Sequence, residues 1–321
     1  MKYNVRVTGL LVGLFLLAQL VGLAVLYQDI VAVVPTPGGG VEIVHPDTAI
    51  GERPEVEGPD SVLLILFGVF IGTVLLLLII RYASVAYWKI LFFLAVWSTI
   101  SVSLGVLIPA DLALPAFSGL AETVPVNFLV AIGLALLLAI VKLARPNILI
   151  HNLTELLIYA GIAVVFVPLL TVEWAILLLL VISAYDAFAV WQSRHMVTLA
   201  KYQVKSRVFA GLLISEGRPA AKDAAPAKGR RAAQAPAAQE AILGGGDVAF
   251  PLIFAGVVME SLVLAGVAKP IAYLQTLIIP VILAAVVLLL LIKGEQGKFY
   301  PAMPFLTAGC LLGWAAVLLL G

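Results

Sequence analysis

The sequence predicts an all-α fold, a polytopic membrane helix bundle with about nine transmembrane helices. Composition is the first reason: 63% of the 321 residues are hydrophobic and only 12% are charged, whereas a soluble domain is about half apolar and a quarter charged. The second reason is that apolar runs of roughly 20 residues, the length that crosses the hydrocarbon core, recur along the chain. The third is the lack of alternating strand patterns, because only helices and closed barrels satisfy their backbone groups in lipid.

Apolar runs define the expected spans in order. They lie at 8–27, 61–82, 87–108, 124–144, 148–169, 171–192, 247–268, 270–292 and 299–320. The first run is expected to be an uncleaved anchor, because its core from Thr8 to Leu26 is longer than the apolar region of a secretory signal peptide. The fifth and sixth runs nearly meet at Pro168–Glu173, which makes their division the least clear of the boundaries.

The loop charges predict the topology. If the amino terminus is cytoplasmic, all 19 Lys and Arg residues except Arg53 and Lys269 fall on the cytoplasmic side. Positive charge concentrates in cytoplasmic loops of membrane proteins. The bias therefore predicts an odd number of spans, a cytoplasmic amino terminus and an extracytoplasmic carboxyl terminus.

A polar segment divides the chain. The stretch Glu216–Gln239 is rich in Ala, Pro, Lys and Arg and nearly lacks large apolar residues, a composition typical of disorder. We therefore expect a six-span amino-terminal part at 1–212, a flexible cytoplasmic loop at 213–243 and a three-span carboxyl-terminal part at 244–321.

Two aspartates stand out among the residues expected inside the bilayer, where an ionisable group is costly and commonly functional. Asp186 follows Tyr185 near the cytoplasmic end of the sixth span. Asp247 follows Gly244–Gly246 and opens the seventh span, which enters from the same side. Their matched depth on consecutive spans permits a facing pair.

A facing pair of carboxyls has a definite chemistry. Two such groups in a low-dielectric site share one proton, since both do not ionise readily. One then accepts a proton from a water that attacks a peptide carbonyl, while the other donates a proton to the developing oxyanion or departing amine. The pair titrates as a unit, so the sequence assigns neither role to one aspartate. The glycines before Asp247 let an extended substrate backbone approach closely.

Other chemistries have little support. Cys310 is a single cysteine, and His45, His151 and His195 lack the spacing of metal ligands, so no metal and no cofactor are expected. A net charge of +1 gives no argument for nucleic acid. Glu155 and Glu260 are interpreted as structural polar contacts. The GxxxG spacings at Gly68–Gly72 and Gly309–Gly313 are interpreted as helix packing.

Taken together, the motifs resemble those of the presenilin and signal peptide peptidase family of GxGD intramembrane aspartyl proteases, and most closely those of archaeal presenilin homologues. Tyr185-Asp186 stands for the Tyr-Asp motif and Gly244–Asp247 for Gly-x-Gly-Asp. Pro301–Met303 stands for Pro-Ala-Leu, with Met in place of Leu. The resemblance covers the whole chain through its nine spans, and specific motifs touch three short regions.

The resemblance implies a presenilin-like bundle that cleaves single-pass transmembrane proteins within the lipid bilayer. It implies Asp186 and Asp247 as the catalytic pair. The supporting residues that it implies are Tyr185, Gly244, Gly245, Gly246, Pro301, Ala302 and Met303. Since a substrate helix must unwind to be cut, the unwound segment is expected to pair with an exposed strand, located around Ala241–Leu243.

Three alternatives remain open from sequence. One is a membrane protease of the prepilin-peptidase type, which also uses a GxGD motif but has fewer spans. Another is a proton- or ion-coupled transporter that uses the same aspartates, although no internal repeat is evident. The last is a protease-like fold that binds membrane helices without cutting them. Cleavage of a single-pass substrate that depends on both aspartates separates a protease from the transporter and from the non-cleaving fold.

Overall fold

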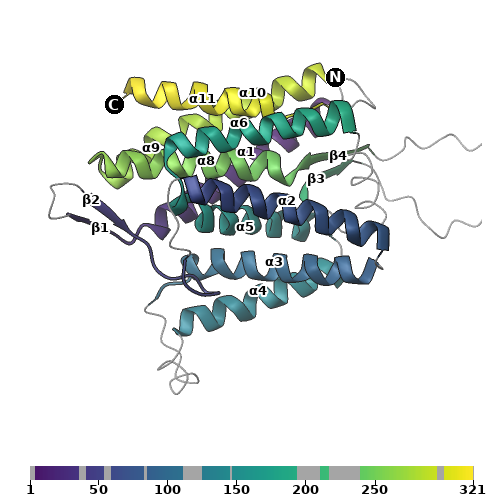
Figure 1. Cartoon of the computed structure of the whole chain (residues 1–321), viewed down its shortest axis with the longest axis horizontal. Helices are drawn as coiled ribbons and strands as arrows, with labels where there is room; N and C mark the ends of the chain where they lie inside the picture. Colours follow the sequence, from purple (N-terminus) through teal and green to yellow (C-terminus); the bar gives the residue numbers. More distant parts are fainter. Residues whose placement is uncertain are drawn as a thin grey trace, which may run out of the picture.

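The computed structural model describes residues 4–35, 41–53, 59–82, 85–110, 125–144, 147–193, 210–216, 239–294 and 300–320. Long helices running side by side make up most of these residues (Figure 1). The helices are α1 (Val5–Asp29), α2 (Pro59–Tyr82), α3 (Val85–Leu107), α4 (Val126–Ala144), α5 (Ile148–Phe166), α6 (Val172–Phe188), α8 (Gly245–Leu264), α9 (Lys269–Thr276), α10 (Ile278–Lys293) and α11 (Met303–Leu320).

These helices match the predicted spans in order. By length and composition, eight helical segments among the described residues can cross a membrane, and α2 adds an apolar segment at Pro59–Leu75. The least clear boundary is also correct: a 3-10 turn at Val167–Leu169 ends α5, and α6 begins at Val172. In Figure 1 the two ends of the chain lie at opposite ends of the bundle, as an odd number of passes requires. The prediction of a polytopic helix bundle is confirmed.

The predicted span at 270–292 is broken into α9 and α10 at Leu277. Pro280 explains the break, because it has no N–H to donate to the carbonyl of Thr276 and its ring crowds that turn. The Thr276 hydroxyl donates to the carbonyl of Ala272 at 2.8 Å, within the last turn of α9. The helix is therefore interrupted at Leu277, where sequence hydropathy alone suggested a continuous helix.

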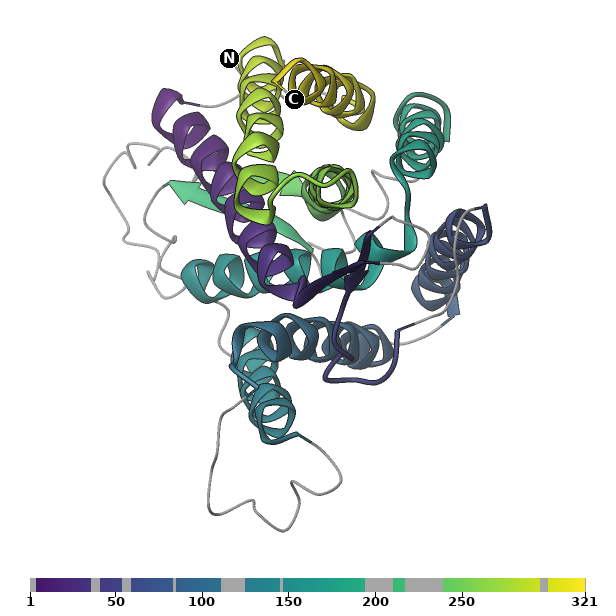
Figure 2. The ribbon, with the colours of Figure 1, turned by 90° about the vertical axis from the view of Figure 1, so that its left-hand side faces the viewer.

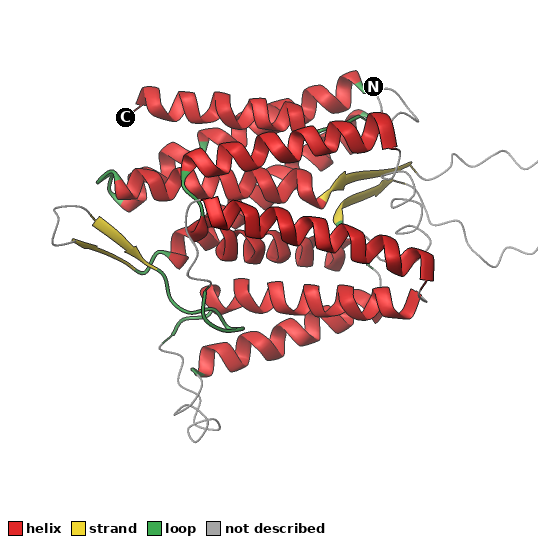
Figure 3. Ribbon diagram, in the orientation of Figure 1, coloured by secondary structure: helices red, strands yellow, loops and turns green. Residues whose placement is uncertain are grey.

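Two short antiparallel hairpins lie at opposite ends of the bundle (Figure 3). One pairs β1 (Ala32–Pro35) with β2 (Val41–Val44). The other pairs β3 (Gly211–Glu216) with β4 (Gln239–Gly244), in the register Gly211↔Gly244 to Glu216↔Gln239. The segment expected as a flexible loop at 213–243 thus begins and ends in paired strand. Residues 217–238 lie outside the described residues.

The helix that carries Asp247, α8, is the most buried of the spanning helices. It contacts α1, α5, α6, α9 and α11, and an end-on view shows it surrounded by these helices (Figure 2). Small residues permit the close approach. A Cβ added at Gly256 would lie 2.6 Å from a Leu26 methyl and 2.7 Å from a Val167 methyl. The core of the bundle is therefore built around the helix that begins with the GGGD sequence.

The two GxxxG spacings behave differently. A Cβ added at Gly309 would lie 3.1 Å from Val286, and one at Gly313 would lie 3.0 Å from Ile279, so this pair packs α11 closely on α10. Gly68 and Gly72 on α2 have no atom within 4 Å of such a Cβ. The packing prediction is right for Gly309–Gly313 and wrong for Gly68–Gly72 within the described residues.

Candidate active site

Asp186 lies in the last turn of α6, where it is buried at 7% exposure. Its Oδ2 accepts a hydrogen bond from the backbone N–H of Met303 at 3.1 Å, and the N–H of Ala302 also bonds to this carboxyl. These N–H groups begin α11, where the first amides of a helix have no partner inside the helix. The amino-terminal end of α11 therefore supplies donors and a favourable dipole to the Asp186 carboxylate.

Asp247 lies in the first turn of α8, with Gly244 as the residue that caps this helix. Its carboxyl turns back over the cap, so that a Cβ added at Gly244 would lie 3.2 Å from Asp247 Oδ2. The side chain is half-buried. Since α6 packs against α8, Asp247 and Asp186 lie on neighbouring helices.

The backbone around Asp247 is unusual in two ways. Pro251, four residues later, has no N–H, so the Asp247 carbonyl lacks the usual donor of an α-helix. The next carbonyl, that of Val248, accepts a hydrogen bond at 2.8 Å from the buried side-chain amide of Gln19 on α1. The turn that carries Asp247 is thus held by a side chain from α1 as well as by its own helix.

The three glycines before Asp247 have different surroundings. Gly244 lies against the Asp247 carboxyl. A Cβ added at Gly245 would lie 3.4 Å from the Tyr159 ring and hydroxyl and 3.5 Å from the Ala210 carbonyl. Gly246 is exposed and a Cβ there would meet only Phe250, at 3.7 Å. Space is therefore restricted at Gly244 and Gly245, and the exposed backbone is at Gly246.

The Pro301–Met303 segment is brought directly to Asp186. Pro301 and Met303 are buried, and the carbonyl of Ala302 accepts from Phe305 and Leu306 to start α11. One turn along, the hydroxyls of Ser183 and Thr307 meet at 2.6 Å between α6 and α11. Tyr185, by contrast, is 46% exposed, and no described contact joins its side chain to either aspartate.

Sequence reasoning did not identify the part played by α5. His151, Asn152, Glu155 and Tyr159 recur at helical spacing on one face, which runs along β3 to the turn at Gly245. Glu155, which had no recognisable partner in the sequence, pairs with Lys142 of α4 at 2.7 Å. Glu260 lies 3.3 Å from His45 at the other end of the bundle. The spacing of the α5 residues was the available signal, but their partners lie far away in sequence.

The described residues contain no group of three or more His, Cys, Asp or Glu side chains that could hold a metal ion. The only described cysteine, Cys310, is buried within α11. The polar groups gathered in this region are thus the two aspartates, the amides that begin α11, and the polar face of α5.

Two aspartates on adjacent spanning helices, one of them held by a third helix end, are the arrangement expected of a membrane-embedded aspartyl protease. Two solved structures, each described as a presenilin family intramembrane aspartate protease, have this fold. The one in space group C222 superposes with a TM-score of 0.57 at 18% identity, covering 96% of this chain and 98% of that chain. The one in P2 gives 0.55 at 18% identity, covering 97% of each. A search of curated protein sequences finds no match.

The family follows from the sequence itself. Residues 40–321 match the model of the signal-peptide peptidase, presenilin aspartyl protease family, and the chain belongs to this family. It is therefore an integral, multi-pass membrane protein and an intramembrane aspartic protease. This assignment does not fit the transporter alternative.

Proposed function

We propose that this protein hydrolyses peptide bonds within transmembrane helices of single-pass membrane proteins, with Asp186 and Asp247 as the catalytic dyad. One observation carries the assignment: α6, which has Asp186 in its last turn, packs against α8, which has Asp247 in its first turn. The family supports the reaction type. Glu155 and Glu260, the other acids expected within the spans, are paired with Lys142 and His45 respectively.

The dyad would act with one proton shared between its carboxyls. The ionised aspartate accepts a proton from a water molecule as the water oxygen attacks the scissile carbonyl carbon. The protonated aspartate donates to the carbonyl oxygen, and collapse of the tetrahedral intermediate sends a proton to the departing amine. Because Met303 donates to Asp186 Oδ2, we expect Oδ1 to be the oxygen that faces the reacting groups.

An unwound substrate segment would dock by adding a strand to β4. The sequence-predicted strand around Ala241–Leu243 corresponds to β4 in the structure. In an antiparallel ladder, alternate residues turn their N–H and C=O away from the partner strand. Gly211 and Leu213 direct these groups to α5, so Ile242, the ladder partner of Leu213, directs its own to the outer edge of β4. Among the described residues, no hydrogen bond from another segment reaches Ile242.

Replacing Ile242 by proline tests this docking edge. Proline removes the outward N–H, which the β3–β4 ladder does not use, and proline is tolerated at such edge positions. We expect KM for a single-pass substrate to rise about tenfold, since a docking hydrogen bond and its partner geometry are lost. Ile242→Ala, which keeps the N–H, is the matched control. Equal KM values for the two variants would contradict docking on this edge.

For the membrane orientation we propose a cytoplasmic amino terminus, supported by the loop charges. Arg53 and Lys269, the two basic residues assigned to the outside, both contact the carboxyl end of α1. Arg53 binds Asp29 at 2.6 Å, and Lys269 donates to the Ile30 carbonyl at 2.7 Å. Their location at one end of the bundle agrees with the charge rule. Protease protection of a tag on each terminus in sealed vesicles measures the orientation directly.

The decisive experiment is cleavage of a reconstituted single-pass substrate by the native protein, Asp186→Asn and Asp247→Asn. Either change should abolish cleavage, because neither carboxamide can exchange the required proton. The native rate should pass through a maximum with pH: at low pH both carboxyls are protonated and no base remains, and at high pH both are ionised and no acid remains. Undiminished cleavage by either variant would remove that aspartate from the mechanism. Proton-coupled uptake lost in the same variants would instead indicate transport.

A further inference from the structure

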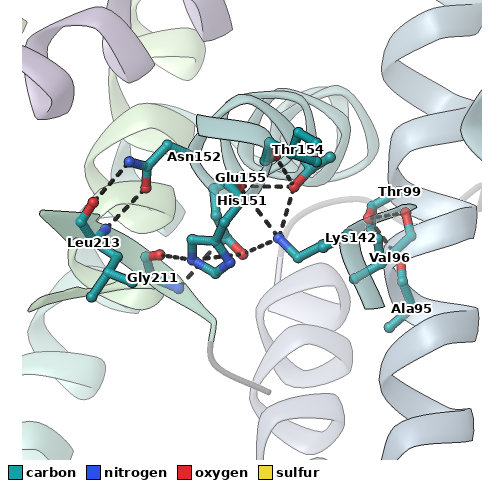
Figure 4. A network of polar contacts seen from close by, with 11 residues as sticks. Ala95, Val96, Thr99, Lys142, His151, Asn152, Thr154, Glu155, Gly211 and Leu213 are labelled. Atoms are coloured by element: carbon teal, nitrogen blue, oxygen red, sulfur yellow. Dashed lines mark hydrogen bonds and ion pairs between the residues drawn. The ribbon is translucent and has the colours of Figure 1, made fainter. Parts of the chain in front are cut away.

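The edge of β3 that faces away from β4 is occupied by side chains of α5 (Figure 4). Asn152 makes both bonds that a neighbouring strand would make to one residue. Its Oδ1 accepts from the Leu213 N–H at 3.0 Å, and its Nδ2 donates to the Leu213 carbonyl at 2.8 Å. The carboxamide of Asn152 therefore substitutes for a peptide group at this edge.

The other outward residue of β3, Gly211, is held in the same way. Its N–H donates to Glu155 Oε2 at 3.2 Å, and its carbonyl lies 2.8 Å from His151 Nε2. Three to four residues along a helix advance about 4.5–6 Å, and two residues along a strand advance about 6.7 Å. This near match of spacings lets one face of α5 satisfy both outward residues of β3.

Lys142 of α4 fixes the carboxylate in this arrangement. Its Nζ lies 2.7 Å from Glu155 Oε1 and donates to the Thr154 hydroxyl at 2.8 Å. The two charged side chains are only 3% and 1% exposed. Since Lys142 holds Oε1, Glu155 directs Oε2 at the Gly211 N–H. A buried charge is costly to move away from its partner, so the pair gives β3 a rigid support.

We propose that His151, Asn152 and Glu155 of α5 act as a fixed third strand, here called the α5 clamp, which closes the outer edge of β3 and positions β4 as the edge open to substrate. These are positioning residues, and the proposal rests on the protease function proposed above. Its chemical consequence is the register of cleavage. Gly211, held by the clamp, pairs with Gly244, and Gly244 caps the helix whose third residue is Asp247.

Register matters because strand pairing is periodic. A slip of one residue turns every side chain to the other face of a strand. Leu212, Ala241 and Leu243 face the core and are buried, which opposes such a slip from one side. The α5 clamp also opposes a slip of β3, through its hydrogen bonds to the backbone of Gly211 and Leu213. A substrate strand added to β4 would thus pass Asp247 in one preferred register.

The experiment compares Asn152→Leu with two matched variants of α5. Leu is close to Asn in size but forms neither bond to Leu213. Asn152→Gln keeps the carboxamide on a longer side chain, and Leu153→Ala changes the adjacent residue, which is 49% exposed. The readouts are the termini of the cleavage products by mass spectrometry, and deuterium exchange of the peptide that contains β3.

For Asn152→Leu we expect exchange in β3 to be about fivefold to tenfold faster, since the Leu213 amide loses its acceptor. The fraction of product cut at secondary positions should at least double, and Asn152→Gln should restore part of both properties. Leu153→Ala should match the native protein in both. Unchanged exchange and an unchanged product pattern in Asn152→Leu would overturn the clamp.

Two further outcomes are separable. If the native protein cuts no substrate, the proposed function fails, and the exchange measurement alone still decides whether α5 holds β3. If Asn152→Leu does not fold, Asn152→Asp replaces it. Aspartate accepts from the Leu213 N–H but cannot donate to the Leu213 carbonyl, so a partial shift in products supports the clamp and an unshifted pattern overturns it.

Discussion

Two buried charge networks, one near each hairpin, occur among the described residues, and they hold different parts of the structure. Near β3–β4, Lys142 pairs with Glu155 Oε1, and Glu155 Oε2 accepts a hydrogen bond from the Gly211 N–H of β3. Near β1–β2, Asp29 is bound by Arg53 at 2.6 Å and by His45 at 2.9 Å, and His45 also lies 3.3 Å from Glu260. Both networks solve the problem of charge in an apolar surrounding by pairing.

The difference lies in what each network holds. Arg53 connects loop to helix: it donates to the carbonyls of Pro46 and Val164 as well as to Asp29. The Lys142–Glu155 network holds the backbone of β3, whose partner strand leads into Asp247. We infer that the first network stabilises the bundle and the second also sets the geometry of the active site. Substitutions in the Arg53 network should therefore lower stability alone, whereas substitutions in the Lys142–Glu155 network should also change the positions of cleavage.

The largest effect is expected for Glu155→Leu. It leaves Lys142 as an unpaired buried charge and the Gly211 N–H without an acceptor, which should lower the free energy of unfolding by about 3–5 kcal/mol. Unfolding in a denaturing detergent measures this change. The double variant Lys142→Met/Glu155→Leu should recover much of the stability, because no unpaired charge remains, but exchange in β3 should stay fast. Slow exchange in the double variant would show that the hydrogen bond from Gly211 to Glu155 is not what protects β3.

A smaller effect is expected for Arg53→Met in the other network. Asp29 keeps His45 but loses its charged partner, and two carbonyls lose their donor, so the free energy of unfolding should fall by about 2–3 kcal/mol. The termini of the cleavage products should not change, since no contact of Arg53 reaches β3 or β4 among the described residues. Arg53→Lys, which keeps the charge without the forked geometry, should fall between native and Met. A shifted product pattern in Arg53→Met would contradict the division between the two networks.

The smallest effect is expected for Ser183→Ala, between the two networks and next to Asp186. The Ser183 and Thr307 hydroxyls meet at 2.6 Å, and Thr307 also lies 3.4 Å from the Leu179 carbonyl. Thr307 therefore keeps one partner, and the loss should be about 1 kcal/mol in unfolding free energy. The cleavage rate should fall while the cleavage positions stay nearly the same, because α11 supplies the amide that holds Asp186. A normal rate with normal stability would show that this pair does not position α11.

The sequence alone determined the helices and the candidate aspartates, because both depend on local properties. Apolar runs of about 20 residues must be helical in lipid whatever surrounds them, so the spans were predicted in order. Asp186 and Asp247 were conspicuous for the same reason, since ionisable residues are rare within such runs. The strand around Ala241–Leu243 came from the family resemblance and not from its own pattern.

Only the tertiary structure decided how the polar groups pair. The hydrogen bonds of Asn152 to Leu213 and of Met303 to Asp186 join residues that are 61 and 117 positions apart, and no periodicity in the chain encodes such distances. Identical GxxxG spacings at Gly68–Gly72 and Gly309–Gly313 likewise have different surroundings. The physical reason is that helix formation in a membrane requires only a residue's own segment, whereas a buried hydrogen bond or a close helix contact depends on which other segment the fold brings beside it.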